Sequence, residues 1–109
     1  MSRKNDARRS TRLSLQIPVV VTSLDSARDF YEECKTAYVN AHGCAIIVRE
    51  WLPDETPVML KLVSNGALEK GHVVLAVALL ESVSWLLGVE FDSPGNFWEV
   101  ENPPADWLA

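Results

Sequence analysis

The chain has 109 residues, of which 48% are hydrophobic and 23% charged, close to the average for a soluble globular protein. This length fits one small domain, and this composition excludes wholesale disorder, a collagen-like repeat and a coiled coil. The longest apolar run, Val73–Leu80, is far shorter than the roughly 20 residues that span a bilayer. The N-terminus lacks the apolar core of a signal peptide, and two cysteines are too few for a disulfide framework. We therefore expect a cytoplasmic protein without membrane insertion.

Charge is distributed unevenly along the chain, whose formal net charge is −5 at pH 7. Residues 1–12 carry five basic side chains and one acidic, a net charge of +4, whereas residues 13–109 carry five basic and fourteen acidic, a net charge of −9. A basic arm of this kind is typical of anion binding, to phosphates, nucleic acid or anionic lipid, and equally of a solvated, disordered terminus. We expect a flexible basic arm ahead of an acidic body.

The body is predicted to consist of β-strands. Leu13–Val21 alternates in the manner of a half-buried strand, and Pro18 on its outward phase favours a sheet edge or strand start. A polar turn over residues 22–29 separates it from a second predicted strand, Phe30–Asn40. Unbroken alternation in the second strand predicts one face with Thr36, Tyr38 and Asn40 and the other with Ala37 and Val39.

Four further strands are predicted along the rest of the body. They are Cys44–Val48, Val58–Val63, Gly71–Leu80 and Trp85–Phe91. The pair Asn65-Gly66 predicts a type I′ hairpin turn, because both residues tolerate positive φ. The period over Val73–Leu80 also allows a helix, but its length and valine content favour a strand. Six short strands separated by turns indicate a barrel or sandwich.

Three segments resemble motifs of the PilZ domain family, and together they cover residues 7–92. Arg8-Arg9-Ser10-Thr11-Arg12 is similar to the family's RxxxR motif ahead of the first strand. Tyr38-Val39-Asn40-Ala41-His42-Gly43-Cys44-Ala45 stands where the family has (D/N)xSxxG, and Leu87-Gly88-Val89-Glu90-Phe91 is similar to the strand that ends most family barrels. The resemblance implies a six-stranded antiparallel barrel, in agreement with the strand count.

The expected organisation is therefore all-β and has three parts. Residues 1–12 form the flexible basic arm, residues 13–92 form a PilZ-like barrel, and residues 93–109 form an aromatic tail with a short turn or helix. We expect this tail to pack on the barrel, since its aromatic side chains would bury large apolar areas.

The second motif can be aligned in two ways. In the first alignment Gly43 matches the motif's glycine, Asn40 stands for serine and Tyr38 replaces the Asp or Asn. In the second, Asn40 takes the Asp or Asn position, His42 replaces serine and Ala45 replaces glycine. The first is preferred because it keeps the glycine.

The resemblance implies binding of the bacterial second messenger cyclic di-GMP, a dianion with two guanines. Each guanine presents O6 and N7 as paired acceptors, which an arginine fork matches in a bidentate manner, and arginine also pairs with phosphate. Arg8 and Arg12 match RxxxR, and Arg9 between them is an additional phosphate contact. The predicted ligand-binding residues are Arg8, Arg9, Arg12, Tyr38, Asn40, His42 and Gly43.

An alternative function is a PilZ module that does not bind nucleotide and acts as a protein-interaction adaptor, because the second motif is incomplete. In either case we expect a protein partner or a homo-oligomer.

Other classes of function have weaker support. Catalysis is not expected, since no nucleophile–base pair or phosphate-binding loop is apparent, and no cofactor is implied. Cys34, His42, Cys44 and His72 match no common zinc spacing, so no metal is expected. The acidic body argues against nucleic acid, which requires a positive groove.

Overall fold

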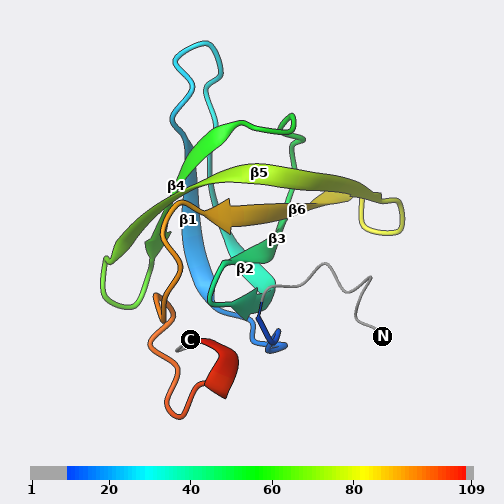
Figure 1. Ribbon diagram of the computed structural model, residues 1–109. Coiled ribbons are helices and arrows are strands. Elements are labelled where there is room, and N and C mark those ends of the chain that lie inside the picture. The colour runs from blue at the N-terminus through cyan, green and yellow to red at the C-terminus, as the bar shows by residue number, and fades with distance from the viewer. Residues whose placement is uncertain (1–9, 108–109) are drawn as a thin grey trace.

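The computed structural model describes residues 10–107, which form a closed antiparallel barrel of six strands in the order β1-β2-β3-β6-β5-β4 (Figure 1). The elements are β1 (Pro18–Ser23), β2 (Tyr31–Asn40), β3 (Gly43–Val48), β4 (Pro57–Leu62), β5 (Leu68–Leu79), β6 (Ser84–Phe91) and a single 3₁₀ turn, η1 (Ala105–Trp107). The predicted all-β, six-stranded barrel is therefore confirmed, and Val73–Leu80 belongs to a strand as far as Leu79. Within the described part of the chain, no helix is long and apolar enough to cross a membrane.

The barrel interior is filled by alternate side chains of the strands, most of them β-branched or leucine. The fully buried valine, leucine and isoleucine side chains of the strands are Val19, Val21, Val39, Ile46, Val48, Val58, Leu60, Val73 and Leu87. This interior alternation is the period-two signal that the sequence carries. A small barrel of this kind is packed solid, so any ligand must bind on its outer surface or at its ends.

The first strand begins later than predicted, at Pro18 instead of Leu13. Leu13 forms only an isolated bridge with Val39, and the amide of Leu15 donates to the carbonyl of Leu13, which bends the chain. Farther along, the hydroxyl of Thr36 accepts a hydrogen bond from the amide of Ile17 at 2.9 Å. The alternation extends beyond the strand because Leu13 and Ile17 still pack against the core.

A bulge in β2 makes the predicted faces of this strand wrong. The pairing of β2 with β3 shifts between Thr36 and Tyr38, so Thr36 lies opposite the buried Ile46 and Tyr38 lies opposite Ala45. The extra residue at the bulge moves Thr36 to the interior, although Tyr38 and Asn40 stay together on the outer face. The alternation of the sequence cannot reveal such a bulge, because one extra residue is enough to exchange the inner and outer faces of the strand.

The turn between β4 and β5 also differs from the predicted type I′ turn. Gly66 has a φ of 77°, but Asn65 is not among the described residues with positive φ. The amide of Gly66 donates to the carbonyl of Leu62 at 2.8 Å, and the amide of Leu62 donates to the carbonyl of Ala67 at 2.9 Å. The loop therefore spans residues 63–67, and within it only Gly66 has the left-handed conformation.

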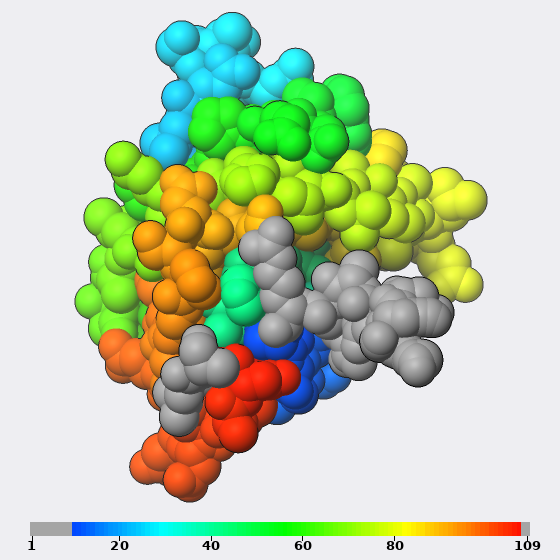
Figure 2. All heavy atoms as spheres, in the orientation of Figure 1, coloured from blue at the N-terminus to red at the C-terminus, as the bar shows by residue number. Residues whose placement is uncertain are grey.

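The segment after β6 returns to the end of the barrel where β2 meets β3. Trp98 is buried and its indole N–H donates to the carbonyl of Asn40 at 3.0 Å. Trp107 is also buried and donates to the carbonyl of Thr11 at 2.7 Å, while Asp106 accepts from the amide and hydroxyl of Thr11. Figure 2 shows this segment, in red, against the blue residues that precede β1.

The strands β3 and β6 approach each other closely at Gly43. A Cβ on Gly43 would lie 1.9 Å from the carbonyl oxygen of Val89, far inside van der Waals contact. Gly43 is buried and is the first residue of β3, directly after the turn. Only glycine fits this position without moving one strand away from the other.

We predict that Gly43→Ala lowers the free energy of unfolding by about 3 kcal/mol, the upper end of the usual cost of overpacking. Gly66→Ala is the control, because it has the left-handed backbone but no atom within 4 Å of an added Cβ. Its expected cost is about 1 kcal/mol. Urea denaturation measures both, and equal losses would show that the approach to β6 is not the constraint.

The two cysteines are free, and both have thiols that resist ionisation. Burial raises the pKa of Cys34 from its ordinary 9.0 to about 12, with smaller contributions from the negative charges of Glu32 and Glu33. Burial, with a smaller contribution from the negative charge of Cys34, also raises the pKa of the Cys44 thiol. Both thiols are protonated near neutral pH, and a protonated thiol is a poor nucleophile and metal ligand.

We predict that iodoacetamide alkylates the folded chain at pH 8 at least tenfold more slowly than the urea-unfolded chain. The raised folded-state pKa values also predict that stability is retained below pH 9 and falls as the pH rises from 9 towards 12, because the unfolded thiols ionise first. A Cys34→Ala variant should show a smaller fall over this range in thermal melts. An identical fall would contradict the protonated Cys34 thiol.

Candidate functional site

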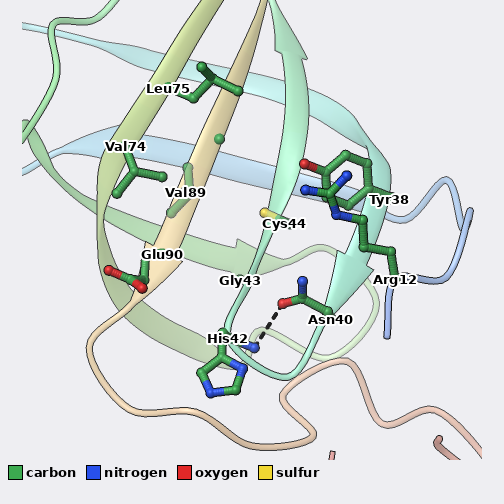
Figure 3. A pocket seen from close by; sticks show the side chains of 11 residues that line it. Arg12, Tyr38, Asn40, His42, Gly43, Cys44, Val74, Leu75, Val89 and Glu90 are labelled. Atoms are coloured by element: carbon green, nitrogen blue, oxygen red, sulfur yellow. Dashed lines mark hydrogen bonds between the residues drawn. The ribbon is translucent and has the colours of Figure 1, made fainter. Parts of the chain in front are cut away.

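A groove of about 180 Å³ lies on the outer surface of the barrel, over β3 and β6 (Figure 3). Two rows of cross-strand neighbours build it. One row runs Tyr38–Ala45–Gly88–Leu75, and the next runs Asn40–Gly43–Glu90–His72, each across β2, β3, β6 and β5. The small residues Ala45 and Gly88 occupy the middle of the first row, and Gly43 occupies the β3 position of the second. The outer surface of the sheet is therefore hollowed between the larger side chains on either side.

Arg12 and Tyr38 form one side of the groove. The guanidinium carbon of Arg12 lies 4.3 Å from the centre of the Tyr38 ring, within the range of a cation–π contact. Arg12 is held there because the neighbouring Thr11 is bonded to Asp106 and Trp107, and Leu13 is bridged to Val39. The arginine therefore has a fixed position at the groove and presents its donors to solvent.

Asn40 and His42 form the end of the groove beside the β2–β3 turn. The side-chain oxygen of Asn40 accepts a hydrogen bond from the amide of His42 at 2.8 Å, which closes the turn. The hydroxyl of the buried Ser10 accepts from the amide of Ala41 at 3.1 Å and lies 3.1 Å from Nδ1 of His42. These bonds orient the Asn40 amide group and fix the turn.

Glu90, Val74 and Leu75 lie on the side of the groove away from Arg12 and Tyr38, as Figure 3 shows. Glu90 lies 3.3 Å from Nε2 of His72, measured from its carboxylate oxygen. A bulge in the pairing of β5 with β6 between Val73 and Leu75 leaves Val74 and Leu75 both exposed beside Gly88. The groove is thus positive and aromatic on one side, and acidic and aliphatic on the other.

The structure brings together five of the seven predicted ligand-binding residues. Arg12, Tyr38, Asn40, His42 and Gly43 all line the groove. Arg8 and Arg9 lie outside the described residues, so their predicted role stays a prediction. Residues 10–12, the end of the predicted flexible arm, are bonded to the barrel end and to the C-terminal segment.

The geometry agrees with the alignment that places the motif's glycine at Gly43. Backbone of β6 occupies the space where a side chain would lie at that position. Ala45, the glycine position in the second alignment, carries its methyl group in a fully buried site without such a requirement.

Sequence reasoning missed the residues that complete the groove from β5 and β6. These are Val74, Leu75, Gly88, Val89 and Glu90, together with Cys44 from β3. Gly88 and Glu90 belong to Leu87–Phe91, which the sequence identifies only as the last strand of the barrel. The alternation within Leu87–Phe91 places Gly88 and Glu90 on the face opposite Leu87 and Val89. This pattern is the signal from which a position on the outer surface could be predicted.

The described residues hold no metal-binding arrangement. No group of three or more His, Cys, Asp or Glu side chains in residues 10–107 is arranged to hold a metal ion. Every buried side-chain nitrogen or oxygen in this range has a hydrogen-bond partner. The polar and aromatic groups that line the groove include a guanidinium, an aromatic ring and a side-chain amide.

Comparisons with known proteins add information on the fold. No family model and no curated protein matches the sequence. The PilZ domain of CeSA from a cellulose-synthesizing bacterium is similar in structure, with a TM-score of 0.56 and 20% identity over 77% of this chain and 84% of that one. The Bacillus subtilis inhibitor of motility, MotI/DgrA, has a TM-score of 0.64 and 10% identity over 82% of this chain. This chain spans only 44% of the length of MotI/DgrA.

Identities this low establish a shared architecture and not a shared ligand. The likeness covers most of the described barrel, and one of the two structures is itself a PilZ domain. Taken with the closed six-stranded topology, it shows that the chain has a PilZ-like fold.

Proposed function

We propose that the groove binds cyclic di-GMP and that the chain is a non-catalytic signalling domain. The observation that carries the proposal is the position of Arg12, held against the Tyr38 ring at the edge of a hollow lined by Gly43 and Gly88. Cyclic di-GMP is a bacterial second messenger, so this function places the protein in the cytoplasm.

The Arg12 side of the groove suits the anionic part of the ligand. A guanidinium can bind a phosphate, or the O6 and N7 edge of guanine, through two parallel hydrogen bonds. Glu90, on the other side, would repel a phosphate but can accept hydrogen bonds from the N–H groups of a guanine. These charges favour an orientation with the phosphates near Arg12 and a base over the glycine-lined centre.

Tyr38 and Asn40 compensate in part for the incomplete family motif. Tyr38 cannot act as a short carboxylate or amide, but its ring can stack on a base, as aromatic residues do in many nucleotide sites. Asn40 has its oxygen bonded to the His42 amide, so its NH₂ group is the end that can donate to the ligand.

The size of the groove indicates how much of the ligand it can hold. Pockets that enclose a drug-sized ligand usually have volumes of roughly 300–1,000 Å³, whereas this groove has about 180 Å³. It can therefore hold one base and the adjoining phosphate. In our proposal Arg8 and Arg9, which precede the fixed segment, bind the remainder of the dinucleotide.

We predict that isothermal titration calorimetry detects micromolar binding of cyclic di-GMP to the wild-type chain, and that Arg12→Ala weakens it roughly 10–100-fold, the usual value of a hydrogen bond to a charged group. Arg12→Lys should fall between the two, because it keeps the charge and loses the fork. Lys61→Ala is the matched control, since this exposed basic residue lies on β4 outside the groove, and it should bind like wild type.

Two results would contradict the proposal. One is the absence of heat from the wild-type chain with ligand well above micromolar concentrations. The other is an equal loss in the Arg12→Ala and Lys61→Ala variants, which would indicate only general charge attraction. Tyr38→Phe should retain affinity and Tyr38→Ala should lose it if the ring provides a stacking surface.

A further inference from the structure

Strand β5 is longer than its neighbour β4, and its second half is paired on one side only. β4 pairs with β5 over Leu68–His72, and two further backbone bonds, of 2.7 and 3.0 Å, join Val73 to the segment before β4. On the other side, β6 pairs with β5 as far as Leu79. Within residues 10–107, no strand pairs with Val74–Leu79 on the side away from β6. Figure 1 shows the β5–β6 hairpin reaching beyond the barrel, with its yellow turn at the right of the view.

This open edge of β5, Val74–Leu79, presents backbone hydrogen-bonding groups. In an antiparallel pair, some residues direct their N–H and C=O groups to one neighbouring strand and the intervening residues direct theirs to the other side. Part of the edge therefore directs donors and acceptors away from β6, where no described strand receives them. Such an edge is a template for another extended segment.

The side chains of the open edge lack the charges that usually protect an unpaired strand. Proteins commonly place charged residues or proline on such an edge, which prevents pairing with other chains. The chain follows this rule at the start of β2, where Tyr31–Glu33 pairs only with β1 among the described strands and includes two glutamates. Val74–Leu79 contains neither a charged residue nor proline. Its exposed side chains, such as Val77 at 42%, are aliphatic.

These properties restrict what can pair with the open edge. An occupant must be extended, must have unpaired backbone groups of its own, and must bring aliphatic side chains to Leu75, Val77 and Leu79. The described chain contains one segment with all three properties, which is the open edge itself. Antiparallel pairing about a two-fold axis would place Val77 opposite its own copy and Leu75 opposite Leu79 of the other copy.

The charge of the body also favours this edge as the place of contact between two copies. Residues 13–109 carry a net charge of −9, so two copies repel each other. The repulsion is weakest where neither copy contributes a charge to the contact. The nearest charged residues in sequence, Lys70 and Glu81, both lie outside the open edge.

We propose that the open edge of β5 pairs with the same edge of a second copy and forms an antiparallel, two-fold dimer. Backbone hydrogen bonds join the two β5 strands, so that the two hairpins make one continuous sheet. Six residues from each copy bury much less than the roughly 800 Å² per partner of a standard interface, so we expect a dissociation constant on the order of 10–100 µM. This inference does not rest on cyclic di-GMP binding, because the pairing uses backbone groups of β5.

The test is sedimentation equilibrium of the full-length chain from micromolar to submillimolar concentrations, together with hydrogen exchange of its backbone amides. We expect a monomer–dimer equilibrium that tightens roughly threefold between about 0.05 M and about 0.5 M NaCl, because salt screens the repulsion between two acidic bodies. Amides within Val74–Leu79 should exchange roughly tenfold more slowly in concentrated than in dilute samples.

A charge on the open edge provides the matched comparison. Val77→Lys should weaken the dimer at least roughly tenfold, because lysine on an edge strand opposes pairing. Its melting temperature should stay near that of wild type, since the side chain is exposed. Val63→Lys is the control, because Val63 is 47% exposed and lies in the loop after β4, outside the open edge. It should dimerise like wild type.

Four results would overturn the proposal. They are a wild-type chain that stays monomeric, equal dimerisation of the Val77→Lys and Val63→Lys variants, a dimer without slowed exchange in Val74–Leu79, and a monomer whose open edge is protected by an added peptide, acetyl-Thr-Val-Thr-Val-Thr-amide. The last result would assign the edge to a strand of another protein.

Discussion

The close approach of β3 to β6 is the constraint on which both the barrel and its groove depend. At Gly43 the backbone of β6 occupies the position of a side chain, and two residues later Ala45 lies opposite Gly88. These small residues let the two strands meet without bulky side chains between them on the outer face. Because these residues are small, they leave a hollow that Arg12, Tyr38 and Leu75 surround. Stability and the candidate site are thus consequences of one local arrangement.

The end of the barrel nearest the groove is organised by the two segments that flank it in sequence. Trp107 and Asp106 hold Thr11, and Trp98 holds the carbonyl of Asn40. Position 12 is consequently fixed to the barrel through residues almost a hundred positions away. An arginine so placed would lose less conformational entropy on binding a ligand than one on a free arm.

Local patterns were sufficient to predict the strands, but not the way in which they combine. Alternation in Val58–Leu62 and Trp85–Phe91 reflects burial directly, so these elements were found within a residue or two. The bulge next to Thr36 and the bend at Leu15 depend on hydrogen bonds to distant residues, which a single sequence does not display. For the same reason the motif residues of β2 and the following turn were recognisable, whereas Leu75 and Gly88 became neighbours of Tyr38 only through the register of four strands.

Closure of the barrel determines how such a domain can contact other molecules. Each of the six described strands pairs with a neighbour on both sides over at least part of its length, so only short stretches of strand edge are left to extend the sheet. Recognition of a small ligand must then use side chains on the outer surface or in the loops at either end. The groove over β3 and β6 obeys this rule, because it lies on the outer surface and combines an arginine with an aromatic ring. Two of its lining residues, Gly43 and Gly88, have no side chain, which keeps the sheet surface accessible between the larger residues on either side.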